Sequence, residues 1–189
     1  MLYQSDTVFS KYIVFVSMSI TCFSDKLMGN LLRDSKSTCK LRQHLNVHKS
    51  YHEPCQRLFN AICMDSYIRP HRHLLDRKTE CLIAVRGMMA LIVFDDKGEV
   101  IETIRFGTEK FYNETLGCCG VELSPETWHT VISINSESIL FEVKSGPFEP
   151  ALAKELAAWA PEEKSQESMM YLSKLHELVA SDTCYPKRN

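Results

Sequence analysis

The chain has 189 residues, of which 44% are hydrophobic and 24% are charged, as in one ordinary globular domain with appendages. The formal net charge is −2 and the basic residues are scattered, so the sequence lacks the basic face that nucleic-acid binding requires. The 8 cysteines include no Cys-x-x-Cys pair, which argues against a zinc knuckle, and free thiols in apolar runs predict the reducing cytoplasm.

The first element in chain order is a strand over residues 12–23. The even positions from 14 to 22 are all apolar there, and they alternate with Phe15, Ser17, Ser19 and Thr21, as in a half-buried strand. The run is too short to span a bilayer, and we predict no membrane partner. Residues 1–19 form an N-terminal extension that includes the start of this strand. Alternatively, translation starts at Met18 and the preceding residues are an artefact.

Ser24 or Asp25 can cap a helix that continues to about Asp34, since both side chains accept hydrogen bonds from backbone amides. A polar connector follows to about residue 56. We therefore expect residues 20–66 to provide a strand, a helix and a connector that pack on the main domain.

A series of short apolar segments follows, separated by turn residues. Asp95 to Gly98 form a hairpin turn in which the glycine can adopt a positive φ. Short strands at this spacing predict a β-sandwich or barrel over residues 67–148. The expected strands are 80–85, 88–94, 99–106, 120–124, 128–134 and 138–144.

Prolines end this β-region, and the remainder, residues 149–189, reads as helices and a tail. Residues 151–159 have helix-like composition and end before Pro161. Residues 166–180 carry apolar side chains at helical spacing. The second helix could pack on the barrel or on a twin subunit, which would make the protein a homodimer. The last nine residues are expected to fray.

The most informative segment contains His71 and His73. Residues i and i+2 of a strand point to the same face, so the two imidazoles can converge while Arg72 points away. Glu80 opens the next strand and His129 lies on a later one. Three imidazoles and a carboxylate suit zinc, iron, manganese or nickel, so we predict one divalent metal ion per chain.

This pattern resembles the two motifs of the cupins. The first cupin motif has His-x-His, three or four residues, Glu, six residues and Gly; here six residues precede Glu80 and six more precede Gly87. The second motif, Pro-x-Gly-x-x-His, corresponds to Pro125 through His129, one residue shorter and without the glycine. The two extra residues before Glu80 could displace it and leave three histidines with water.

A narrower group shares these departures: from about Ile20 to Glu162 the chain resembles the WbuC family of cupin-fold metalloproteins. The matching segments are Asn46-Val47-His48, Glu53 to Arg57, Tyr67 to His73, Trp128-His129-Thr130, Glu142 to Phe148 and Trp159-Ala160-Pro161. The resemblance implies an all-β core, a cupin double-stranded β-helix or jelly-roll-like barrel, with short N-terminal and C-terminal helices and the metal inside. Members of the family are encoded in O-antigen polysaccharide gene clusters.

Several charged and polar residues are candidates for ligand binding. Arg72 and Lys78 could rim the mouth and favour an anionic, sugar-like small molecule, because cations pair with phosphate and carboxylate. Glu142 is the candidate catalytic proton carrier, and Lys144 shares its face of the strand, although both could equally face solvent from an edge strand. Further candidates for the substrate site are Gln56 and His48, although both could instead tie the connector to the barrel.

Three functions are consistent with this pattern. The first is a metal-dependent enzyme, an isomerase or epimerase, a hydrolase or a dioxygenase, that acts on a small polar or anionic carbohydrate-like substrate. The second is a non-catalytic barrel that binds or senses a small ligand. In the third, the metal only stabilises the barrel, which a closed site with four ligands would favour.

Overall fold

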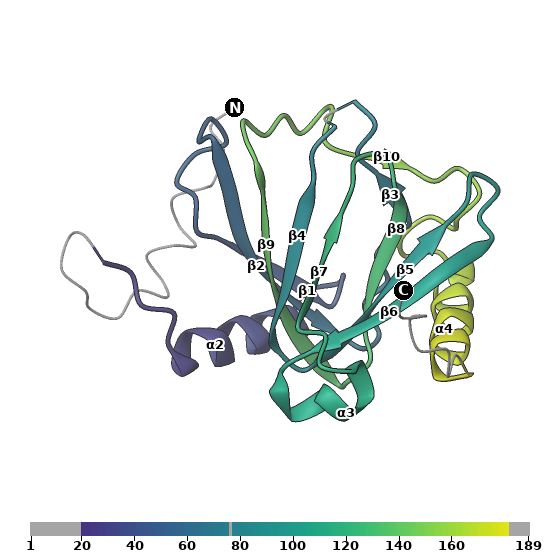
Figure 1. Cartoon of the computed structure of the whole chain (residues 1–189), viewed down its shortest axis with the longest axis horizontal. Helices are drawn as coiled ribbons and strands as arrows, with labels where there is room; N and C mark the ends of the chain where they lie inside the picture. The colour runs from purple at the N-terminus through teal and green to yellow at the C-terminus, as the bar shows by residue number, and fades with distance from the viewer. Residues whose placement is uncertain (1–19, 76, 182–189) are drawn as a thin grey trace.

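The structure is a computed structural model that describes residues 20–75 and 77–181. Two antiparallel five-stranded sheets face each other and lean together into a barrel (Figure 1). The first sheet has the order β1-β2-β9-β4-β7, with β1 Arg42–Asn46, β2 Cys55–Cys63, β9 Glu137–Ser145, β4 Glu80–Arg86 and β7 Gly120–Leu123. The second has the order β10-β3-β8-β5-β6, with β10 Glu155–Leu156, β3 His71–Arg72, β8 Trp128–Ser133, β5 Met88–Phe94 and β6 Val100–Gly107.

Without the edge strands β1 and β10, the two orders are β2-β9-β4-β7 and β3-β8-β5-β6. This is the arrangement of an eight-stranded jelly roll built from two Greek keys, the architecture of the cupins. The predicted all-β cupin fold is therefore confirmed. β1 and β10 end their sheets and are not hydrogen-bonded to each other, so within residues 20–75 and 77–181 the barrel is unpaired along that side.

Three apolar layers hold the barrel and its helices together. Inside the barrel, Ile62, Leu82, Met89, Phe106 and Leu140 belong to one buried cluster. Because side chains alternate along a strand, the opposite sheet faces bury separate clusters beneath helices. Each fully buried Leu, Ile or Phe contributes about 1.5–3 kcal/mol, so the interior cluster is a major source of stability.

The helices α2, Asp25–Lys36, and α4, Gln166–Ser181, cover the outer faces of the two sheets (Figure 1). Ser24 caps α2 by accepting a hydrogen bond from the Leu27 amide at 3.2 Å, as predicted. Leu31 of α2 packs on the first sheet and Leu175 of α4 packs on the second. The short helices η1, Glu109–Phe111, and α3, Tyr112–Thr115, connect β6 to β7 and were not predicted.

Most predicted strands are present, and the hairpin turn is confirmed at Gly98, whose φ is +89°. Three predictions fail. The connector contains β1, a strand with one buried residue, Leu45, and otherwise partly exposed side chains that concealed it. Residues 151–159 form turns and β10 instead of the predicted helix, because β10 pairs with β3 and becomes the edge strand of the second sheet. Residues 20–24 are not in a strand, while the rest of the predicted strand over 12–23 and the tail after 181 lie outside the described residues.

Candidate metal centre

The sheet that contains β3 and β8 brings the three predicted histidines together. His71 of β3 is the direct partner of His129 of β8, and His73 follows two residues after His71 on the same face. The ring centroids of His71 and His129 are 4.5 Å apart, and His73 lies 5.5 and 6.0 Å from the other two. None of the three is more than 5% exposed, so they form a buried cluster.

Backbone carbonyl groups fix the orientation of all three rings. The Nδ1 atom of His71 lies 3.1 Å from the Arg69 carbonyl oxygen, and that of His129 lies 2.9 Å from the Thr127 carbonyl oxygen. The Nδ1 atom of His73 is bonded to the Ala153 carbonyl oxygen. A carbonyl only accepts hydrogen bonds, so each Nδ1 carries a hydrogen. In a neutral ring the lone pair is then on Nε2 and points away from that carbonyl.

The carboxylate of Glu80, on β4 of the facing sheet, meets these Nε2 atoms. Its Oε1 lies 3.0 Å from Nε2 of His73 and its Oε2 lies 3.4 Å from Nε2 of His129. One ligand atom from each of the four residues lies within 4.8 Å of all the others. The two extra residues in the loop before Glu80 therefore do not carry it away from the histidines.

This arrangement leaves polar atoms that only a cation would satisfy. The buried Nε2 of His73 has no hydrogen-bond partner, although an oxygen of Glu80 is close to it. A ring lone pair that faces a carboxylate oxygen is repelled unless a proton or a metal ion lies between them. Three neutral imidazoles and one carboxylate are a donor set that divalent transition metals accept, so these residues fit such an ion.

The protonation states inside the cluster also suit a metal ion. Burial and the Lys154 cation hold the pKa of His71 well below 6.5, so this ring is neutral at neutral pH. Burial alone would raise the pKa of Glu80. The adjacent His129 and His73 rings and the charge of Lys144 outweigh that effect and hold the pKa of Glu80 well below 4.5. Glu80 is therefore a carboxylate, which is the form that binds cations.

Two predicted polar residues of β9 continue the network. Nζ of Lys144 lies 2.9 Å from Oε1 of Glu80 and 2.7 Å from Oε1 of Glu142, and the lysine is only 6% exposed. Burial would lower the pKa of Lys144, but the two carboxylates raise it above its ordinary value, so it remains a cation. Glu142 is thus close to the cluster but already engaged in an ion pair.

The other four predicted ligand-binding residues make contacts elsewhere. The Gln56 amide donates to loop carbonyl oxygens, including that of Glu53 at 2.9 Å, so it ties the connector to β2. His48 accepts a hydrogen bond at Nδ1 from the Arg57 amide at 3.0 Å. Nζ of Lys78 donates to the Pro147 carbonyl oxygen.

Arg72, the fourth of them, lies on the opposite face of the second sheet from the histidines. Its guanidinium lies 4.4 Å from the Trp128 ring centroid and 2.8 Å from Oε2 of Glu155. The structure therefore does not bring Arg72 to the histidine cluster.

Lys154 is a residue near the cluster that sequence reasoning missed. It follows Ala153, whose carbonyl holds His73, and its charge acts on His71, Glu80 and Glu142. Desolvation of its ammonium group by the surrounding protein lowers the pKa of Lys154, and the charges of Glu80 and Glu142 oppose that shift. Nothing in the local sequence indicated this position, because the segment was predicted as a helix.

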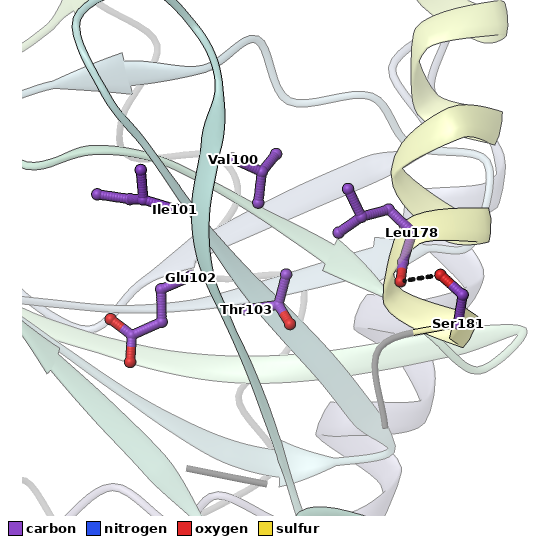
Figure 2. Close-up of a pocket in the computed structure, with 6 residues that line it drawn as sticks. All are labelled: Val100, Ile101, Glu102, Thr103, Leu178 and Ser181. Atoms are coloured by element: carbon purple, nitrogen blue, oxygen red, sulfur yellow. Dashed lines mark hydrogen bonds between the residues drawn. The ribbon is translucent and has the colours of Figure 1, made fainter. Parts of the chain in front are cut away.

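A shallow pocket elsewhere on the surface carries no comparable chemistry. Figure 2 shows it between β6 and the end of α4, where the hydroxyl of Ser181 donates to the Leu178 carbonyl oxygen at 2.9 Å. Glu102 is its one ionisable side chain, and none of the four clustered residues lines it. The pocket is lined by Val100, Ile101, Glu102, Thr103, Leu178 and Ser181.

Comparisons with known families and curated proteins identify no function. The family described as Domain of unknown function (DUF6016) matches residues 23–106, a range that contains His71, His73 and Glu80 and ends before His129. The match does not give the WbuC family, so that resemblance stays a prediction. A search of curated proteins found no match. In the described part of the chain, no helix is both long and apolar enough to cross a membrane.

Solved structures with a similar arrangement of strands share little sequence with this chain. Protein SO0799 from Shewanella oneidensis is 12% identical, with a TM-score of 0.49 over 76% of this chain and 87% of that one. KdgF from Halomonas sp. is 16% identical, with a TM-score of 0.41 over 58% of this chain and 82% of that one. Oxalate decarboxylase from Bacillus subtilis is 12% identical, with a TM-score of 0.45. The matched region covers 61% of this chain but only 27% of the decarboxylase.

Proposed function

We propose that this protein is a metal-dependent cupin that holds one divalent cation on His71, His73, His129 and Glu80. The observation that carries the proposal is the shared orientation of the three rings. Each Nδ1 is bonded to a backbone carbonyl, and the Nε2 atoms of His73 and His129 face the Glu80 carboxylate. Such outer hydrogen bonds fix the tautomer of metal-binding histidines and increase their basicity.

The surrounding residues define what the site could do with a ligand. A bound divalent ion would polarise a carbonyl or hydroxyl group of the ligand, or activate a water molecule. Lys144 holds Glu80 ionised and neutralises Glu142, so the two carboxylates coexist in a buried region. Glu142 is the nearest additional carboxylate in this network, and we assign it the proton transfer of an isomerisation or hydrolysis.

We propose a small polar, carbohydrate-like molecule as the ligand. Support comes from the resemblance of Tyr67 to His73 and Trp128 to Thr130 to the WbuC family, and a role in O-antigen polysaccharide synthesis is the finer form of the same proposal. One observation favours a second function, non-catalytic binding. Oε1 of Glu142 lies 2.7 Å from Nζ of Lys144, and an ion-paired carboxylate is a weaker base than a free one.

Metal analysis tests the proposal directly. Protein purified without chelator should contain about one equivalent of divalent metal, and His73→Ala should lower that content several-fold. His52→Ala, which changes an exposed histidine in a loop, should leave it unchanged. Chelation should remove roughly 4 kcal/mol of stability if the metal is present at a thousandfold excess over its Kd. Folded wild-type protein that takes up no metal from zinc, iron, manganese or nickel solutions would refute the proposal.

A second measurement separates an open site from a closed one. Manganese-loaded protein should enhance the relaxation of water protons if a water molecule or ligand occupies an exchangeable position on the metal. Without any enhancement the metal would be purely structural, because a closed coordination shell admits no ligand.

A further inference from the structure

The unpaired side of the barrel holds polar groups that the metal centre does not use. β1 and β10 are the free edges of the two sheets there. Leu45 of β1 packs under α2, so its neighbour His44 faces the interior. Both His44 and Lys154 are exposed to solvent. Arg42 of β1 donates to the Tyr67 carbonyl oxygen at 2.8 Å, in the segment that leads into β3, and β3 pairs with β10, so the two edges lie near each other.

The direction of Lys154 follows from its neighbours. Glu155 pairs with Arg72, which stacks on Trp128 on the outer face of the second sheet. Adjacent residues of an extended chain point to opposite faces, so Lys154 points to the face that carries His71 and His73. Its electrostatic interactions with Glu80 and Glu142 agree with this placement.

A buried polar atom without a partner lies on the same interior face. Asn60 of β2 is the direct partner of His44 and is 6% exposed, and its Oδ1 has no hydrogen-bond partner in the part of the chain that the structure describes. An unsatisfied buried acceptor destabilises the folded protein, because it has lost its hydrogen bonds to water. Native proteins rarely keep such atoms, so a ligand that donates a hydrogen bond would remove the cost.

The charges around this region are unbalanced once the metal is present. Lys144 and Lys154 balance Glu80 and Glu142, so the charge of a divalent ion on the histidines remains uncompensated. Of the two lysines, Lys144 is held between both carboxylates, whereas Lys154 is exposed to solvent. Lys154 is therefore the cation that is accessible to a ligand.

We propose that Lys154 and Asn60 form the recognition end of the ligand site and select a small hydroxylated anion. The carboxylate or phosphate of the ligand would pair with Lys154, and one of its hydroxyl groups would donate to Oδ1 of Asn60. This inference rests on the proposed metal centre. It assigns anion recognition to Lys154 of the C-terminal segment. The residues predicted for this role, Arg72 and Lys78, contact other parts of the protein.

The test compares three sugars that share one ring: D-glucuronate, D-glucose 6-phosphate and neutral D-glucose. Their affinities are measured by calorimetry on zinc-loaded protein. We expect at least one of the two anions to bind at least tenfold more tightly than glucose. Lys154→Met should abolish that preference and Lys154→Arg should keep it, whereas Lys174→Met, an exposed lysine of α4, should change nothing. Whichever anion shows the preference identifies the group that the site selects.

A second variant and a metal analysis complete the test. Asn60→Leu should weaken binding of the preferred anion and of glucose by a similar factor, because both offer the same hydroxyl groups on the ring. Anions that bind no better than glucose, or Lys154→Met protein that keeps the preference, would overturn the assignment of Lys154. Zinc is measured in the same samples. Wild-type protein that takes up none of zinc, iron, manganese or nickel overturns the metal centre and this inference together, whereas metal-loaded protein without discrimination overturns only the inference.

Discussion

Lys144 offers the sharpest test of the charge network, because it lies between two carboxylates in a buried region. Its Nζ is 2.9 Å from Glu80 and 2.7 Å from Glu142. At an effective dielectric constant of about 20, each pair attracts by roughly 6 kcal/mol before desolvation. The cost of burying the ammonium offsets much of that attraction. Removing one member of a buried ion pair nevertheless costs about 3–5 kcal/mol, since the partner charges remain buried.

We therefore expect Lys144→Met to lower the free energy of unfolding of the metal-free protein by about 3–5 kcal/mol, or Tm by roughly 6–20 °C. The loss should be smaller in the metal-loaded protein, because the cation neutralises Glu80. The double variant Lys144→Met/Glu142→Gln should recover part of the lost free energy of unfolding. Urea unfolding with and without chelator measures all of these values. Lys40→Met, which breaks a half-exposed pair, should cost no more than about 1 kcal/mol.

A loss of under about 1 kcal/mol for Lys144→Met in the metal-free protein would refute this reasoning, since it would mean that water solvates both carboxylates. Equal losses with and without metal would also contradict it. In that case the bound ion would not neutralise the charge of Glu80.

Three further predictions concern other parts of the protein. Burial raises the pKa of Glu163, but its contacts with Lys40 and Arg42 depress it below 4.5 overall. Glu163 therefore stabilises the fold above that pH, and the difference in urea unfolding between wild type and Glu163→Gln should vanish as the pH falls through the folded-state value. Arg72→Ala should cost about 1 kcal/mol of stability yet leave the zinc content unchanged; a loss of zinc would show that Arg72 serves the metal site. Gly98→Ala should cost about 1–3 kcal/mol by urea unfolding, because φ is +89° and the new Cβ would lie 2.6 Å from Trp159; an unchanged midpoint would contradict it.

The barrel strands were predictable because their patterns are local. Residues 88–94 are a continuous apolar run, because Met89 and Leu91 point into the interior while Ala90 and Ile92 pack under α4, and β5 has the predicted bounds. β1 lacks such a pattern, since Leu45 is its one buried residue, and only pairing with β2 makes it a strand. Edge strands are defined by their neighbours, which a single segment does not reveal.

The same distinction separates the site residues that were predicted from the one that was missed. His71 and His73 carry a spacing that indicates a shared face, and His129 lies in the predicted strand over residues 128–134. Lys154 carries no pattern at all. It reaches the site because β10 pairs with β3, an interaction between segments about eighty residues apart in the chain.

β10 therefore links the proposed metal centre to the rest of the C-terminal region. Ala153 just before it holds Nδ1 of His73. Ala157 just after it donates its amide to the Pro70 carbonyl oxygen at 2.9 Å and packs in the cluster that α4 covers. A shift of this segment would move a ring of the cluster and the Lys154 cation together. The segment is thus a determinant of the site geometry. A strand of only two residues is enough to hold it in place, because Ala157 at its end packs against α4.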